Sequence, residues 1–189
     1  MSDGPHKSLP MRNGWRKLAE RGANTNFDAD EIGAAVPDAI GGDWVEEGCD
    51  HAVRELRQIL DNRQGSLFSE EREDRIETLK DVSAQGSPFR RMIIESVIQA
   101  SESNPDPPTA LRAGVESALA QRLLRGSLQV EEHYLRRGDA AASTIRARIA
   151  EGITKMPPAS LADHFLSRGS TSLPHSEKRD GLDDGPRLP

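Results

Sequence analysis

The residue types best suited to chemistry gather in one stretch, RLLRGSLQVEEHYLRR, which covers residues 122–137. This stretch places Glu131, Glu132, His133 and Tyr134 side by side, with arginines on both flanks. A carboxylate close to an imidazole can carry out acid–base catalysis or bind a metal ion. Glu131, His133 and Tyr134 are therefore a candidate polar site. The alternative interpretation is that this stretch forms the solvated side of a helix.

The spacing of these residues argues against a metal centre. A helical di-iron site needs Glu-x-x-His pairs on two helices, whereas Glu131 and His133 are two residues apart and Glu132 is adjacent to His133. The chain also lacks the H-E-x-x-H and C-x-x-C zinc motifs, glycine-rich phosphate loops and the G-x-S-x-G nucleophile motif. We therefore expect no catalytic residue, metal or cofactor that the sequence can identify.

The stretch from residue 109 to residue 137 has the periodicity of a long amphipathic helix. Its apolar residues form two ridges, one of Leu119, Leu123, Val130 and Tyr134 and one of Leu124, Leu128 and Leu135. We expect both ridges to be buried, which makes this helix the centre of the fold. Glu131 falls between the ridges, so its carboxylate needs either an arginine from another helix or a small polar cavity.

The polar face of this helix, together with the next helix, carries a candidate interaction surface rich in arginine. Its members are Arg122, Arg125, Gln129, Glu132, Arg136, Arg137, Arg146 and Arg148. Residues 23–83 hold 16 acidic and 6 basic side chains, so we expect these arginines first to pair with that acidic half. A protein partner ranks second. Nucleic acid ranks third, because the pI is about 5.4 and only 4% of residues are aromatic.

Two further segments invite functional hypotheses. Residues 1–11 read as an extended N-terminal arm, in which apolar residues beside prolines suit docking; the candidate docking residues are Leu9, Met11 and Trp15, although Trp15 also suits the core side of a first helix. Cys49 and His51 stand near a helix start, where a reactive thiol or half of a metal site is conceivable. A small buried cysteine beside surface polar residues is the favoured interpretation.

Local signals indicate an all-α fold, an irregular bundle of about seven to eight helices. Helix starts are marked by the D-x-x-E capping boxes at Asp28 and Asp43, by Ser87 followed by a proline, and by Ser160. Pro37 is expected to end or kink its helix. The predicted helices span residues 13–22, 29–40, 44–63, 70–84, 88–103, 109–137, 140–155 and 160–168.

The chain of 189 residues predicts one helical domain at 12–168, with a proline-rich hinge at 103–109 and a disordered tail at 169–189. The single cysteine suits a reducing compartment, and no run reaches the ~18 apolar residues of a membrane helix. We therefore expect a cytoplasmic protein without a membrane span.

The sequence favours a non-enzymatic helical interaction protein, such as an adaptor, a regulator or an accessory subunit of a complex. Its partner would be another protein or a second copy in a homo-oligomer. The alternatives are a nucleic-acid-associated accessory protein that uses the arginine surface and, third, a small helical enzyme with a dispersed site.

Overall fold

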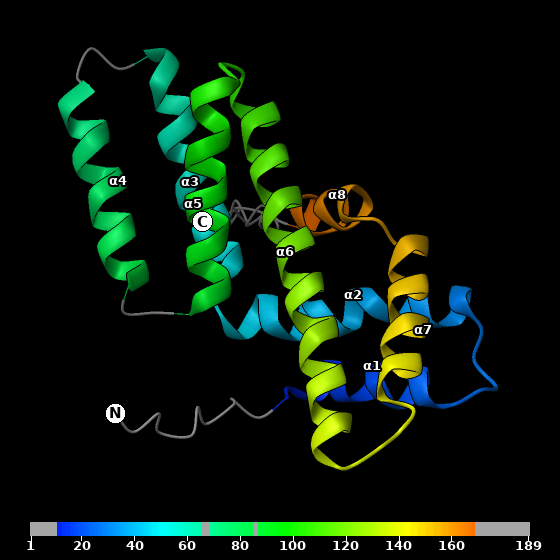
Figure 1. The fold of residues 1–189 in the computed structure, drawn as a ribbon. Helices are drawn as coiled ribbons and strands as arrows, with labels where there is room; N and C mark the ends of the chain where they lie inside the picture. Colours follow the sequence, from blue (N-terminus) through cyan, green and yellow to red (C-terminus); the bar gives the residue numbers. More distant parts are fainter. Residues whose placement is uncertain (1–10, 66–68, 85–86, 169–189) are drawn as a thin grey trace, which may run out of the picture.

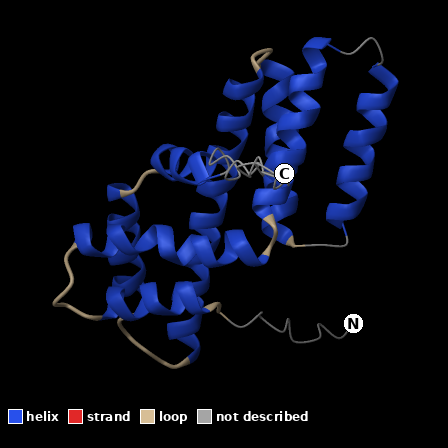
Figure 2. Ribbon diagram, turned by 180° about the vertical axis from the view of Figure 1, so that it is seen from behind, coloured by secondary structure: helices blue, strands red, loops and turns tan. Residues whose placement is uncertain are grey.

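The protein is an all-helical bundle (Figure 1), seen in a computed structural model that describes residues 11–65, 69–84 and 87–168. The expected all-α class is confirmed, and the described residues contain helices and loops but no strand (Figure 2). The helices are α1 (Asn13–Ala23), α2 (Ala29–Glu46), α3 (Cys49–Gly65), α4 (Ser69–Ala84), α5 (Pro88–Ser103), α6 (Pro107–Arg136), α7 (Ala142–Lys155) and α8 (Pro158–Arg168). Residues 1–10 and 169–189, which hold most of the expected arm and the expected tail, lie outside the described residues.

The long helix α6 connects two groups of helices. Its N-terminal half lies beside α5, with α3 and α4 farther out, and its C-terminal half lies beside α7, where α1 and α2 pass behind it (Figure 1). It contacts α1, α3, α5, α7 and α8. The predicted central helix is therefore present and central. The rotation of α6 about its axis therefore determines which of its residues contact each of these helices.

Several helix boundaries follow from local chemistry as expected. Asp28 caps α2 with a full capping box, in which Glu31 N donates to the Asp28 side chain at 2.8 Å and Asp28 N donates to the Glu31 side chain at 3.0 Å. Ser87 caps α5, and Pro88 occupies its first turn. Both signals are read from neighbouring residues alone, which is why the sequence predicts them well.

The boundary between α2 and α3 was predicted wrongly. Helix α2 continues through Pro37 to Glu46, and α3 begins only at Cys49, after Gly48 with a φ of 67°. Asp43 is therefore inside α2, and it caps no helix although it matches the D-x-x-E pattern. Its side chain is buried among other helices, which removes it from the role that the local pattern suggested.

The turn between α5 and α6 joins the two helices that share the most extensive contact of the fold. Gly114 of α6 lies so close to α5 that an added Cβ would stand 2.3 Å from Val97 Cα. Only a residue without a side chain permits that approach. The hinge expected at 103–109 stays a prediction, and in the structure its residues 104–106 are the short connection between these tightly packed helices.

Aromatic side chains fill the centre of the core. Trp44 stacks on Phe165 at 4.6 Å between ring centroids and meets Phe89 edge-on at 5.9 Å, and all three are buried. Trp15 of α1 packs against Gly126 of α6, where an added Cβ would collide with the indole ring at 2.1 Å. These four buried aromatic side chains come from α1, α2, α5 and α8, and Trp15 is the one that meets α6 at Gly126.

Only one of the two predicted apolar ridges of α6 is buried. Leu119, Leu123 and Val130 are in the core and Tyr134 packs partly against it. The exposed fractions of Leu124, Leu128 and Leu135 are 59%, 44% and 57%. The prediction that both ridges are buried was therefore wrong, because the neighbouring helices cover one side of the apolar arc and leave the other uncovered.

This difference predicts unequal effects of two leucine truncations on α6. Leu123→Ala leaves a cavity in the core and is expected to lower the free energy of unfolding by roughly 2–5 kcal/mol. Leu128→Ala, on the same helix with the same chemical change, is expected to lower it by less than about 0.5 kcal/mol. Urea unfolding followed by circular dichroism measures both, and equal losses would show that the two faces of α6 are assigned wrongly.

Candidate interaction site

The two adjacent glutamates of residues 122–137 pair with different neighbours. Glu131 accepts hydrogen bonds from Arg146 Nη1 at 2.6 Å and from Ser143 Oγ at 3.2 Å, both on the α7 side. Glu132 instead pairs with Arg136 on the exposed side of the same helix. The first of the two alternatives for Glu131, an arginine from another helix, is therefore the one that the structure contains.

His133 and Tyr134 lie against each other, edge to face, with 5.4 Å between ring centroids. Partial burial, followed by the nearby Arg137, lowers the pKa of His133, and partial burial raises the pKa of Tyr134. Both groups are therefore neutral near pH 7. Within the described part of the chain, no three His, Cys, Asp or Glu residues are grouped to hold a metal ion.

The predicted arginine surface is not one continuous basic surface. Arg122 pairs with Asp43, Arg146 with Glu131, and Arg136 with Glu132. Arg148 donates to backbone carbonyls, including Gly22 O at 2.6 Å and Asn24 O at 3.0 Å, and so fixes the loop between α1 and α2. Arg125 and Arg137 are the arginines of the set that make neither an ion pair nor a hydrogen bond to a backbone carbonyl among the described residues. Most of these arginines therefore serve the fold.

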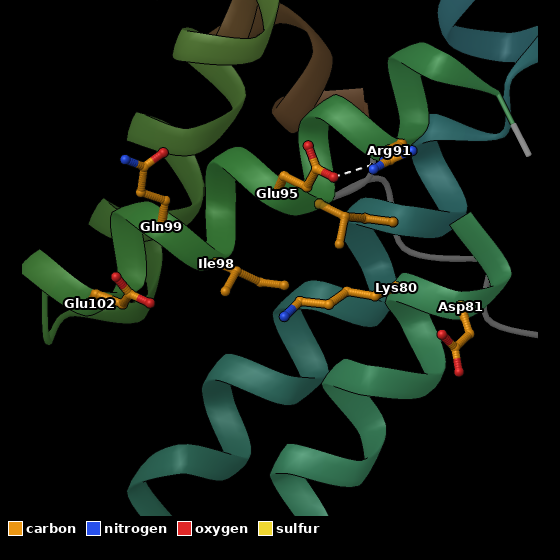
Figure 3. Close-up of a pocket in the computed structure, with 8 residues that line it drawn as sticks. Lys80, Asp81, Arg91, Glu95, Ile98, Gln99 and Glu102 are labelled. Carbon is orange, nitrogen blue, oxygen red and sulfur yellow. Dashed lines mark hydrogen bonds and ion pairs between the residues drawn. The ribbon is translucent and has the colours of Figure 1, made fainter. Parts of the chain in front are cut away.

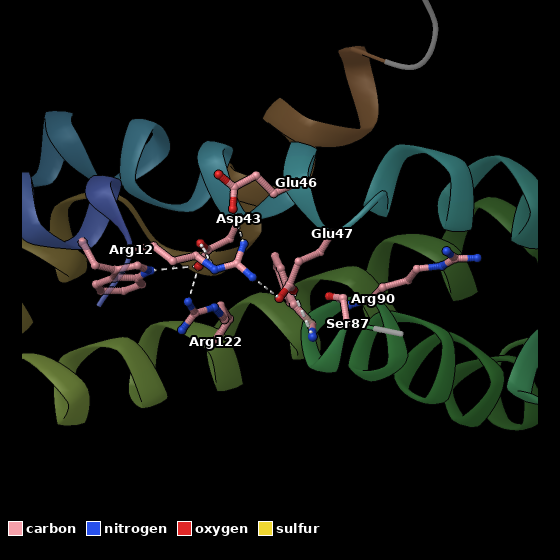
Figure 4. A network of polar contacts seen from close by, with 9 residues as sticks. Arg12, Asp43, Glu46, Glu47, Ser87, Arg90 and Arg122 are labelled. Carbon is pink, nitrogen blue, oxygen red and sulfur yellow. Dashed lines mark hydrogen bonds and ion pairs between the residues drawn. The ribbon is translucent and has the colours of Figure 1, made fainter. Parts of the chain in front are cut away.

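A buried polar cluster around Asp43 joins three parts of the chain (Figure 4). The Asp43 carboxylate, 1% exposed, accepts a hydrogen bond from Trp15 Nε1 at 3.0 Å and is paired with the Arg122 guanidinium. Asp43 Oδ1 makes no hydrogen bond, but Arg12 Nε lies 3.5 Å from it. The guanidinium of Arg122 also stands over the Trp15 ring at 5.2 Å. This cluster fixes α1, α2 and α6 relative to one another.

The cluster extends through Arg12 to the start of α5. Arg12 pairs with Glu46 at 2.7 Å and with Glu47 at 2.9 Å, and the other oxygen of Glu47 accepts from Phe89 N at 3.1 Å. Sequence reasoning missed this network because each of its contacts joins residues at least 28 positions apart in the chain. The acidic excess of residues 23–83 was the one available signal, since it predicts that some carboxylates pair with distant arginines.

A groove of about 230 Å³ opens beside the cluster, between α5 and α6. Buried Phe89 and Met92 form its apolar part, and Arg125 and Gln129 line it from α6. Arg125 and Leu128 are three residues apart and therefore neighbours on the same face of the helix. The groove thus borders the exposed leucine ridge, and together they form a surface that is apolar in the middle and basic at one edge.

Two of the three N-terminal docking candidates lie in the core rather than on a free arm. Trp15 is fully buried and Met11 is 9% exposed, so neither side chain is available to a partner in this structure. Trp15 lies on the core side of the first helix, as the alternative interpretation expected. Leu9, the third candidate, lies outside the described residues.

A cleft of about 640 Å³ lies between α4 and α5 (Figure 3). It is lined by side chains of both charges, and Arg91 Nε is bonded to Glu95 at 2.8 Å. Ile94 and Ile98 supply its apolar part. Its lining contains no histidine, serine or cysteine, so a Ser–His or Cys–His pair is absent from this cleft.

Comparison with known proteins gives this chain no family. No family model, curated protein or solved structure matches it. No helix in the described ranges combines the length and apolar character that crossing a membrane requires.

The exposed ridge of α6, composed of Leu124, Leu128 and Leu135, is the surface feature that the fold itself does not use. Large aliphatic side chains exposed singly are ordinary, but these three share one face of one helix. Their exposed fractions, each above 40%, show that no described helix covers them. Contiguous apolar surface with a polar rim is typical of protein interaction sites.

The Asp43 cluster predicts a strong effect of removing one charge. Asp43→Asn keeps the shape but leaves Arg122 without its buried counter-charge, so the free energy of unfolding is expected to fall by roughly 3–5 kcal/mol. The loss should change little with salt, because buried pairs are weakly screened. Glu132→Gln, which removes the exposed pair with Arg136, is the matched control and should cost less than about 0.5 kcal/mol. Similar small losses for both variants in urea unfolding would contradict the structural role of Asp43.

Cys49 is predicted to be an unreactive thiol in the folded protein. Its side chain is fully buried, and burial, followed by the nearby Glu47 carboxylate, raises the pKa of the thiol. The thiol is therefore protonated at pH 8, whereas thiol reagents attack the thiolate. Labelling with Ellman's reagent should be fast in urea and slow in buffer; fast labelling of the native protein would mean that Cys49 is accessible.

Proposed function

We propose that this protein is a non-enzymatic interaction protein that binds a protein partner on the outer face of α6. The observation that carries the proposal is the exposed ridge of Leu124, Leu128 and Leu135 on the helix around which the rest of the fold is built. Covering such side chains removes apolar surface from water, at about 25 cal/mol per Å². A rigid helix also loses little conformational freedom when a partner binds.

The position of the ridge supports this proposal. The opposite side of α6 is fixed by the Asp43–Arg122 pair and by the contact of Trp15 with Gly126. The leucines cannot rotate into the core without breaking both. The ridge is therefore a permanent surface of the folded protein, and the groove that Phe89 and Met92 help to line lies beside it.

The two alternative functions have less support. Phosphate binding needs several free basic side chains, whereas four arginines of the predicted surface are engaged within the fold. Acid–base catalysis needs neighbouring groups that share a substrate, whereas Glu131 faces α7 and Glu132 faces solvent. A protein partner makes use of the exposed leucines, which neither alternative explains.

Site-specific photo-crosslinking in cells tests the proposal. With a photoreactive amino acid at Leu128, we expect a discrete protein adduct that disappears when Leu124 and Leu135 are also changed to Ser. The same photoreactive group at Arg54, exposed on α3, is the control and should give no such adduct. Equal patterns at the two positions, or an adduct that persists without the other leucines, would contradict binding on the outer face of α6.

A further inference from the structure

The outer face of α6 has the spacing of a coiled-coil seam. Exposed or half-buried residues recur along it at alternating intervals of four and three, and they are Ser117, Gln121, Leu124, Leu128, Glu131 and Leu135. A repeat of 3.5 residues on average is what keeps one seam of a helix facing another helix. The ridge therefore fits a helical partner better than a flat or an extended one. At 1.5 Å per residue the seam is about 27 Å long, which is five turns.

The charges beside the seam select the identity and direction of that helix. Arg125 and Glu132 are seven residues apart, so both flank the same side of the seam. Arg125 makes no ion pair with a described residue, and Glu132 is exposed, with its partner Arg136 beside it on the same helix. In an antiparallel pair of two α6 helices, the same flank of each helix faces the other. When the twofold axis passes between Gln129 and Val130, Arg125 lies two residues along the axis, about 3 Å, from the level of Glu132 of the second copy. The two long side chains span this offset, and the contact occurs twice.

The same register also pairs the leucines. When the twofold axis passes between Gln129 and Val130, Leu124 of one copy meets Leu135 of the other. Leu128 then meets Glu131, whose carboxylate is already neutralised by Arg146, so that its aliphatic stem is available for packing. A parallel pair of α6 helices does not combine the charge contacts with the leucine contacts, because it does not bring Arg125 and Glu132 together.

We propose that the outer face of α6 binds a second copy of this chain as an antiparallel helix pair, with reciprocal Arg125–Glu132 contacts. This inference rests on the proposed function, of which it names the partner. The symmetry is that of an isologous dimer, in which one surface serves both subunits. Three leucines per copy make a small interface, so the association is expected to depend on concentration.

Charge reversal tests this arrangement with the full-length chain. Sedimentation velocity over a range of protein concentrations should show a monomer–dimer equilibrium for the parent. Arg125→Glu and Glu132→Arg should each weaken the dimer about tenfold or more, because each creates two like-charge contacts. Mixing these two variants should restore association as a heterodimer, since the introduced glutamate and arginine then face opposite charges throughout. Circular dichroism checks that each variant is folded, and Arg54→Glu on α3 is the control.

The outcomes separate this inference from the function on which it rests. A parent that stays monomeric to several hundred micromolar, or a dimer indifferent to both reversals, would overturn the second copy as the partner. The crosslink at Leu128 would then join a chain of different mass, and the interaction function would stand. If the second copy is the partner, that adduct has twice the mass of the chain.

Discussion

The buried carboxylate of Asp43 is the constraint on which the rest of this fold depends. A charge in a protein interior is costly unless it is paired and hydrogen-bonded, and Asp43 meets this condition through Arg122 and Trp15, with Arg12 beside it. These three partners come from α6, from α1 and from the residue before α1. Satisfying one carboxylate therefore fixes the rotation of α6 about its axis. That rotation determines which leucines are buried and which are left on the surface.

Short-range chemistry made most of the helices predictable from sequence. The capping box at Asp28 and the Ser87–Pro88 start act through residues within one turn, and both are present as predicted. The same kind of reasoning failed at Asp43, where a D-x-x-E pattern indicated a cap and tertiary contacts placed the residue inside a helix. Periodicity likewise identified the apolar arc of α6 but not the part that neighbours cover. The side of α6 that is covered is determined by Gly126 and Arg122, whose partners are more than 70 residues away in the chain.

The polar stretch that is most conspicuous in the sequence turns out to be structural. Glu131 joins α6 to α7 through Arg146, and Arg148 fixes the loop before α2. The arginines expected to form one surface are distributed among these tasks, and the free surface of α6 is instead apolar with a few charges at its edge. The negative charge of the first half is thus partly neutralised by basic residues of the second half. Asp43 pairs with Arg122, and Asp30 pairs with Lys155 at 3.6 Å.

Helix α6 presents one leucine ridge to the core and the other to solvent or a partner. Hydroxyl-radical footprinting of dilute native protein, read by mass spectrometry, measures this directly, because oxidation rates of leucine follow side-chain exposure. We expect rapid oxidation of Leu124, Leu128 and Leu135 and strong protection of Leu119 and Leu123, which are buried. Protection of both ridges at the lowest concentration would show that the fold itself covers the outer face, and the proposed interaction surface would not exist.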